Sequence, residues 1–225
     1  MLKLIVKSLV AVLISPVVVA VTAAFYKRLL AVGELAPNMN FFLFGILAYM
    51  ILHTLFYKPT FLYVLGHEAV HAGMAWFFGG KVKSLKASKE GGSVKTDKTN
   101  FIIELGPYFV PVYAIIITLV YIALVSSYNI NGATFVFLIG FALAFHVVLT
   151  IEVMKVRQPD MVKSGYFFSV VLVYIFNIIV VALIFAIVFP AFSARLFLAE
   201  TAKATGDIYA AAARQLILLK NLIRN

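Results

Sequence analysis

The chain has 225 residues, of which 64% are hydrophobic and only 12% are charged. A typical soluble domain is about 45–50% apolar and about 25% charged, so this composition excludes an ordinary soluble domain and predicts a lipid bilayer as partner. The formal net charge of +10 does not indicate nucleic-acid binding, because most basic residues lie in short segments between apolar runs, as in membrane proteins.

Six apolar segments are long enough to cross a bilayer as helices, which takes about 20 residues. The first follows Lys3 and Lys7 and resembles a signal peptide, but its length and the basic pair Lys27-Arg28 behind it favour a retained helix. The sequence therefore predicts an all-α polytopic membrane protein. The six segments lie at roughly 8–26, 40–57, 59–79, 101–126, 131–154 and 164–190.

Short breaks separate several of these segments. Only Lys58-Pro59 lies between the second and the third, which predicts a tight helical hairpin. The residues from Tyr128 to Gly132 favour a turn between the fourth and the fifth. Pro107 and Pro111 predict a kink in the fourth helix.

The longest polar connection runs from Gly80 to Asn100 and carries six lysines. Its two arms alternate apolar and polar residues around Glu90-Gly91-Gly92, which predicts a short β-hairpin. Two interpretations remain open: a solvated basic loop, or an edge strand that pairs with an extended substrate.

The tail from 191 to 225 has a different pattern. Its apolar residues fall on one helical face, and Arg214, Lys220 and Arg224 lie elsewhere on the helix. This pattern predicts an amphipathic helix that lies on the membrane or a partner, with a solvated tail helix as the alternative. The apolar face comprises Ile208, Ala212, Leu216, Leu219 and Ile223.

Six crossings would divide the loops between two sides of the membrane. The 27–39, 80–100 and 155–163 segments would share one side, with Lys58 and the tail on the other. Because the first side holds most of the basic residues, it is predicted to be cytoplasmic, although Lys3 and Lys7 argue the other way.

The third apolar segment contains the string His67-Glu68-Ala69-Val70-His71. Histidines four residues apart lie one turn apart on the same helical face, so both imidazoles can bind one zinc ion. Glu68 is then placed to act as a general base on metal-bound water. Charged residues within a span are costly and normally have a partner or a function. The alternative is a hydrogen-bonded packing seam without metal.

The residues from Leu65 to Ala72, followed by Phe78-Gly79-Gly80 and a polar hairpin, resemble the M50 or site-2-protease class of intramembrane zinc metalloproteases, in particular its M50B-like branch. The element from Gly106 to Pro111 is similar to a Gly/Pro element of that class. The resemblance covers roughly residues 60–180, and the first two helices and the tail lie outside it. Because the sequence shows no repeat period, we expect one metalloprotease-like domain over 1–190 with a helical tail over 191–225.

The resemblance also implies an aspartate as third zinc ligand, on a later helix. The usual Asn-Pro and Leu-Asp-Gly strings are missing, and the nearest counterpart is Gln158-Pro159-Asp160. Asp160 is therefore the expected ligand. His146 is the alternative, because counting residues along two spanning helices puts its depth close to that of His67 and His71.

These features predict an intramembrane protease that cuts transmembrane or membrane-anchored proteins, with zinc held by His67, His71 and Asp160. Two other functions remain open. One is a non-catalytic membrane scaffold that keeps the metal for structure. The other is a transporter that uses the intramembrane carboxylates and histidines as a metal or proton path.

Overall fold

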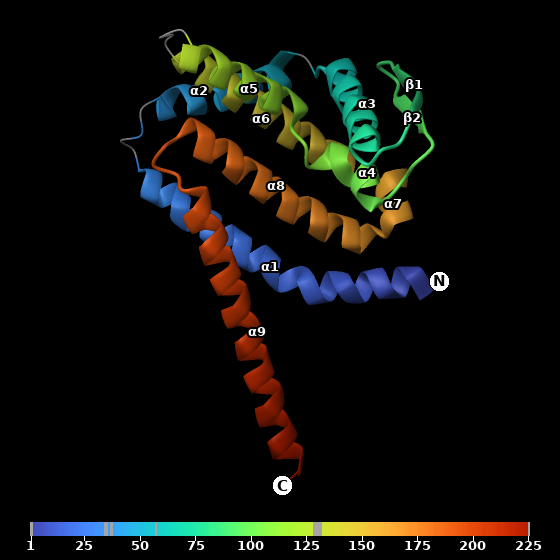
Figure 1. Ribbon diagram of the computed structural model, residues 1–225, viewed down its shortest axis with the longest axis vertical. Helices are drawn as coiled ribbons and strands as arrows, with labels where there is room; N and C mark the ends of the chain where they lie inside the picture. Colours follow the sequence, from blue (N-terminus) through green and yellow to red (C-terminus); the bar gives the residue numbers. More distant parts are fainter. Residues whose placement is uncertain (1, 34–35, 37, 57, 128–131, 225) are drawn as a thin grey trace.

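The computed structural model describes residues 2–33, 36, 38–56, 58–127 and 132–224. They form a mainly helical structure with one small antiparallel sheet (Figure 1). Of the turn predicted from Tyr128 to Gly132, residues 128–131 lie outside the described residues. The elements are α1 (Leu2–Val32), α2 (Met39–Ile51) with a π-helical turn (Leu52–Phe56), α3 (Thr60–Phe77), β1 (Val82–Ala87), β2 (Gly92–Thr96), α4 (Phe101–Leu105) with a 3₁₀ turn (Gly106–Tyr108), α5 (Val112–Ser127), α6 (Ala133–Met154), α7 (Pro159–Ser164), α8 (Tyr166–Val188) and α9 (Ala194–Arg224).

Four of the described helices are long and apolar enough to cross a membrane: α1, α2 with its π-helical turn, α6 and α8. A fifth candidate arises if α4 and α5 count as one broken span, bent by 77°. α3 is not among them, because His67, Glu68 and His71 lower the hydropathy of its 18 residues. The six predicted spans therefore reduce to four or five candidates, which remain compatible with an integral membrane protein.

The break between α4 and α5 confirms the kink predicted from the two prolines. Pro107 lies in the 3₁₀ turn, and Pro111 immediately precedes α5. Neither proline has an N–H to donate, so a continuous α-helix cannot be maintained through this segment. The kink places Tyr108 and the carboxyl end of α4 beside α3.

Helices α2 and α6 pack closely and run in the same direction. A Cβ atom at Gly45 would overlap the carbonyl oxygen of Phe137, and one at Gly140 would overlap that of Phe42. Two glycines thus allow the backbones to approach more closely than any larger residue would permit.

Because α2 and α6 are parallel, their carboxyl ends lie together. Lys58 Nζ is 2.7 Å from Glu152 Oε1, and His53 Nε2 is 3.2 Å from the same oxygen. The alternating six-span arrangement predicted Lys58 on the opposite side from the 155–163 segment. That prediction is wrong, because α3 does not return the chain across the bundle between them.

α3 runs crosswise to α6 and α8 (Figure 1). The hydroxyl of Tyr113, at the start of α5, donates a hydrogen bond of 2.7 Å to the carbonyl of Leu62. The carboxyl end of α3 is followed by Gly79, whose φ of 71° turns the chain into β1. The motif-bearing helix therefore lies at one end of the helical bundle, next to the hairpin.

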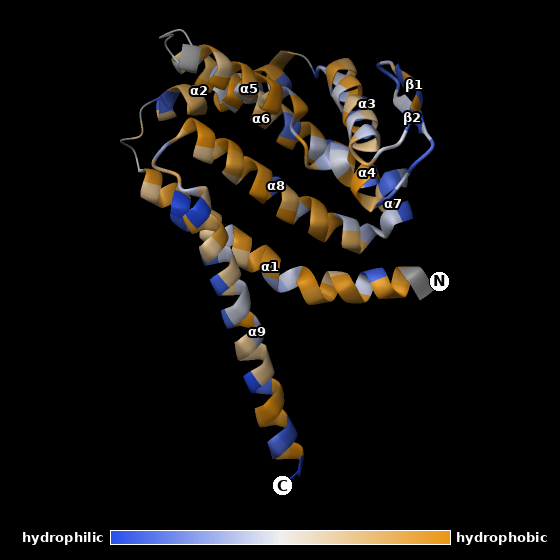
Figure 2. Cartoon of the chain, viewed as in Figure 1, coloured by the Kyte–Doolittle hydropathy of each residue, from blue (hydrophilic) through white to orange (hydrophobic). Residues whose placement is uncertain are grey.

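The predicted β-hairpin is confirmed. β1 and β2 pair antiparallel, with Ala87 opposite Gly92 at the turn. The hydropathy colouring shows this hairpin and α7 as the hydrophilic end of the molecule, whereas α1 and α8 are mainly apolar (Figure 2). Leu9, Leu13 and Leu30 on α1 are each 60% or more exposed. Such an apolar exterior suits lipid chains better than water.

α9 begins against α1 and then extends away from the body (Figure 1). Glu200 lies 2.8 Å from Lys27 and 2.9 Å from Arg28, and the Tyr209 hydroxyl donates to the carbonyl of Leu13. Residues 210–224 are exposed throughout. The tail is therefore helical as predicted, and its second half lies free of the rest of the described chain.

Candidate metal centre

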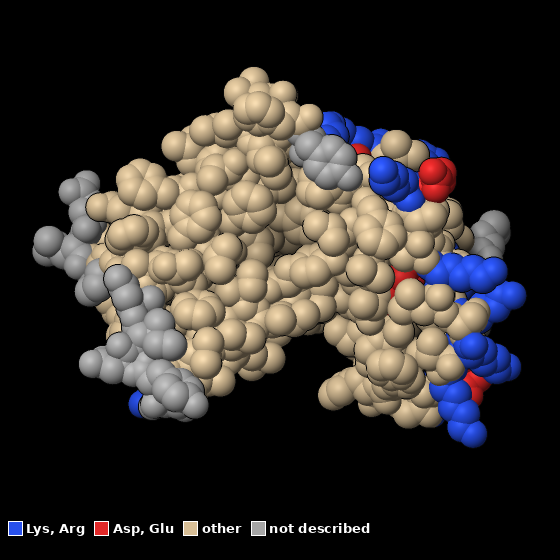
Figure 3. All heavy atoms as spheres, turned by 90° about the horizontal axis from the view of Figure 1, so that it is seen from above, with Lys and Arg blue, Asp and Glu red and all other residues tan. Residues whose placement is uncertain are grey.

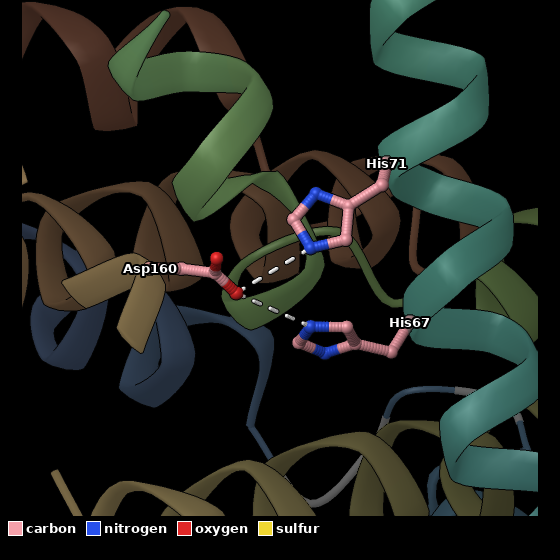
Figure 4. Close-up of side chains that lie close together, drawn as sticks. All are labelled: His67, His71 and Asp160. Carbon is pink, nitrogen blue, oxygen red and sulfur yellow. Dashed lines mark ion pairs between the residues drawn. The ribbon is translucent and has the colours of Figure 1, made fainter. Parts of the chain in front are cut away.

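His67 and His71 lie on one face of α3, one turn apart. Their ring centroids are 4.9 Å apart, and their side chains are 13% and 15% exposed. Their Nε2 atoms both point towards α7 (Figure 4). The helical spacing read from the sequence thus produces a pair of imidazoles that converge on one position.

α7 brings Asp160 to this pair. Pro159 occupies the first turn of α7 after an extended Gln158, which is a favourable helix start. Asp160 Oδ2 lies 3.8 Å from His67 Nε2 and 3.5 Å from His71 Nε2. The three ligand atoms lie within 4.8 Å of one another, and this is the one such group among the described residues.

These separations fit a shared cation better than direct pairing. A charge-assisted hydrogen bond between an imidazolium and a carboxylate would be about 2.7–2.9 Å long. Ligand atoms about 2.1 Å from a tetrahedral zinc ion lie roughly 3.4 Å apart. The distances of 3.5 and 3.8 Å are close to the second value. His67, His71 and Asp160 therefore fit a zinc ion as ligands.

The orientation of the His71 ring is fixed by a hydrogen bond at Nδ1, the ring nitrogen that faces away from Asp160. Its Nδ1 lies 2.8 Å from the carbonyl oxygen of Ile103 on α4, which can only accept. His71 must therefore carry its proton on Nδ1, and the lone pair of Nε2 is free for a metal. Such a partner is typical of metal-binding histidines.

His67 has no comparable hydrogen bond. Its Nδ1 is buried without a partner among the described residues. The ring is instead held between Tyr63 and Tyr108, with centroid distances of 5.9 and 5.1 Å. Packing against two aromatic rings therefore limits the rotation of this imidazole.

Tyr108 also reaches the third ligand. It is buried, and its hydroxyl lies 3.5 Å from Asp160 Oδ2, at the long limit for a hydrogen bond. Sequence reasoning assigned Tyr108 no role of its own. Its position between Pro107 and Pro111 was the one available signal.

Asp160 is held in its ionised form. Burial raises the pKa of its carboxyl group, but the neighbouring imidazoles of His67 and His71 outweigh burial and hold the pKa well below its usual range. An ionised carboxylate is the form that binds a metal.

Glu68 is buried at 7% exposure and lines the same cavity as the three ligands. Gly92 of β2 packs directly on it: a Cβ atom at Gly92 would lie 2.5 Å from Glu68 Cγ. The hairpin therefore packs closely on the Glu68 side chain, and a larger residue at this point of β2 would displace that side chain.

The cavity has a volume of about 900 Å³. It is bounded by α3, by β2 and the turn before it, by α7, and by the carboxyl end of α6. This volume lies at the upper end of the range for small-molecule sites and can hold a short peptide segment. Its walls include Tyr63, Ser93, Lys95, Val153 and Gln158.

His146, the alternative third ligand, lies near His67, and both line a second, small cavity. It is buried, and its Nε2 is 3.2 Å from the side-chain oxygen of Asn177. The Asn177 amide in turn donates to the carbonyls of Tyr108 and Val173. The structure thus uses Asn177 to connect helices, and His146 does not join the group of His67, His71 and Asp160.

Glu104 on α4 is a buried carboxylate, with the residue only 9% exposed. Its carboxylate accepts hydrogen bonds from Thr99 and Ser164 and pairs with Lys163. The sequence held no signal for this buried group, because its partners are up to 60 residues away.

Two imidazoles and a carboxylate beside a buried glutamate can hold a divalent cation, with one coordination position left for water. Glu68, a carboxylate that lines the same cavity, can transfer a proton to or from that water. A comparison of the chain with family models, curated proteins and solved structures gives no match.

Proposed function

We propose that this chain is an intramembrane zinc metalloprotease that hydrolyses peptide bonds of transmembrane or membrane-anchored proteins. The observation that carries the proposal is the convergence of His67, His71 and Asp160 within 4.8 Å, in a cavity that Glu68 also lines. Catalytic zinc sites use three protein ligands and keep an open position, whereas structural sites use four.

Each residue has a defined role in this proposal. Bound zinc would supply a water with a pKa of about 7 and would polarise the scissile carbonyl. Glu68 would act as the general base on the attacking water and would then hold the proton for transfer to the leaving amine. The carbonyl of Ile103 keeps His71 in the tautomer that offers Nε2. Asp160 contributes one negative charge, which offsets part of the charge of the cation.

The cavity supports a polypeptide as substrate. β2 forms one wall over Gly92–Thr96, so backbone N–H and C=O groups lie near the site. An extended segment can pair with an exposed strand edge through its own backbone. A substrate helix must unwind before it reaches the site, because an intact helix uses its carbonyls in internal hydrogen bonds.

The charge distribution supports a multi-pass topology with the site facing the cytoplasm. Lys7 lies 5.9 Å from the Phe168 ring near the start of α8, at the same end as the hairpin and α7. Lys27 and Arg28 lie at the other end of α1, beside α9. Figure 3 shows Lys and Arg gathered mainly at one end. The positive-inside rule assigns that end to the cytoplasm.

The test compares wild-type protein with Glu68→Gln. Glutamine keeps the size and the cavity contacts but cannot accept the proton. We expect the purified variant to retain one zinc per chain, and the membrane fraction of cells that produce it to lack the new protein N-termini that the wild type generates. The two measurements are zinc by mass spectrometry and N-terminal proteomics.

The outcomes separate the candidate functions. Zinc bound equally by both proteins, with identical N-termini in both membranes, would contradict a protease and indicate a structural metal. Metal or proton flux in liposomes without any cleavage would indicate a transporter. Loss of the N-termini only in Glu68→Gln supports the proposal.

A further inference from the structure

α7 needs external support. It has only six residues, and a helix this short is unstable by itself in water. It nevertheless carries Asp160 in its first turn and ends at Ser164, four residues later on the same face. Whatever holds Ser164 therefore also sets the position of Asp160.

The support comes from Glu104 on α4. The Ser164 hydroxyl donates to Glu104 Oε2 over 2.5 Å, and Lys163 Nζ lies 2.6 Å from Oε1. Thr99 donates a third hydrogen bond to Oε1, over 3.1 Å. Ser164 is fully buried, and the Glu104 side chain is only 12% exposed. A buried carboxylate with three donors is a rigid connection between two elements.

Ile103, the residue before Glu104, contacts the histidine side of the site. The carbonyl of Ile103 accepts from His71 Nδ1 over 2.8 Å. Asn100 caps α4, and its side chain accepts from the backbone N–H groups of Ile102 and Ile103 at 2.9 Å each. α4 thus orients His71 on α3 through the Ile103 carbonyl. It also holds α7, which carries Asp160, through the Glu104 side chain.

We infer that Glu104 is a positioning residue for the metal centre: it holds α7 so that Asp160 meets His67 and His71. This inference rests on the proposed function, because it assumes that the three residues bind zinc. Glu104 itself touches neither zinc nor the hydrolytic water. It acts through Ser164 and Lys163 on α7.

The test measures the zinc dissociation constant by chelator competition in detergent-purified protein. Partners of metal ligands typically contribute about 10–100-fold to affinity. We expect Glu104→Gln to weaken zinc binding by about this factor, and Ser164→Ala, which removes one donor, to weaken it less. The matched control is Glu152→Gln, a second cavity-lining carboxylate that pairs with Lys58 and not with α7.

A double-mutant comparison separates positioning from general support of the fold. In the Asp160→Ala background, Glu104→Gln should leave the remaining zinc affinity unchanged, because the ligand it positions is gone. With Co²⁺ in place of zinc, the visible spectrum of Glu104→Gln should shift towards that of Asp160→Ala. The Glu152→Gln spectrum should match the wild type.

Two results would overturn the inference while leaving the proposed function intact. One is wild-type zinc affinity and an unshifted Co²⁺ spectrum in both Glu104→Gln and Ser164→Ala. The other is an equal loss of affinity with and without Asp160. If Glu104→Gln does not fold, the Ser164→Ala measurement alone decides. Wild-type protein without stoichiometric zinc would overturn the inference and the proposed function together.

Discussion

The side chain of His71 illustrates how the site is prepared by residues outside it. The Ile103 carbonyl fixes the proton on Nδ1, so Nε2 faces the position shared with His67 and Asp160. The motif predicted the two histidines, because their spacing is a local property of a helix. It could not predict Ile103, since a backbone carbonyl is present at every residue and only the fold selects one.

Replacing Asp160 and replacing His146 should have opposite effects on zinc binding. Replacing Asp160 by alanine removes a ligand, so zinc affinity should fall by more than the roughly 100-fold that the loss of an outer partner can cost. His146→Ala should keep one zinc per chain, because His146 contacts Asn177 instead. Chelator titration followed by metal analysis checks both. Loss of zinc in His146→Ala alone would reverse the assignment.

Gly92 offers a separate test of Glu68. A Cβ atom in Gly92→Ala would press on Glu68 Cγ, so the glutamate side chain must move. We expect cleavage to fall by about 10-fold or more, since small displacements of catalytic groups are costly, while zinc remains bound. Gly73→Ala on α3 is the control, because nothing lies within 4 Å of its added methyl group. Equal activity of both variants would argue against the role of Glu68.

Among the elements, the α2–α6 pair and the crosswise α3 account for the largest differences from expectation. Helix boundaries were predictable, because apolar runs end at Lys58-Pro59 or near Gly79. The directions in which the helices run were not predictable, because they depend on contacts such as those of Gly45 and Gly140 with carbonyls far away in the sequence. His146 does lie near His67, since both line one small cavity, but it is not part of the group formed by His67, His71 and Asp160.

The glycine contacts between α2 and α6 should dominate the stability of that pair. Gly45→Ala and Gly140→Ala each place a methyl group on a backbone carbonyl, which cannot move away easily. Overpacking of this kind costs about 1–3 kcal/mol, so the thermal midpoint in detergent should fall. Gly206→Ala on α9, with open space around it, should leave the midpoint unchanged or raise it slightly. Unchanged midpoints for all three would contradict the close packing.

At the scale of the whole molecule, parallel α2 and α6 change which segments share a side. The alternating arrangement put Lys3, Lys7, Lys58 and the tail opposite the basic residues of the 27–39, 80–100 and 155–163 segments. With α3 lying crosswise, Lys7, Lys58 and the hairpin lysines lie at one end. Lys27 and Arg28, at the carboxyl end of α1, pair with Glu200 at the opposite end, so the prediction that the 27–39 segment shares a side with the hairpin is wrong.

The lack of cysteine makes this arrangement easy to test. Single cysteines can be introduced at Lys58, Lys83 and Ala191 and labelled in intact cells with a membrane-impermeant maleimide. We expect Lys58→Cys and Lys83→Cys to be protected alike and Ala191→Cys to react. Six alternating spans predict instead that Lys58→Cys and Ala191→Cys react together. Labelling after cell lysis controls for the accessibility of each thiol.

The placement of α3 at the hydrophilic end of the bundle has a consequence for where a cut would fall. Under the proposed function, hydrolysis draws its water from the adjoining aqueous phase and needs no conduit through the hydrocarbon core. The bond that is cleaved would have to enter the cavity between α3, β2 and α7, beside the carboxyl half of α6. Cleavage would then cut the anchor of the substrate near the aqueous end of its span, and the longer apolar part would stay in the bilayer.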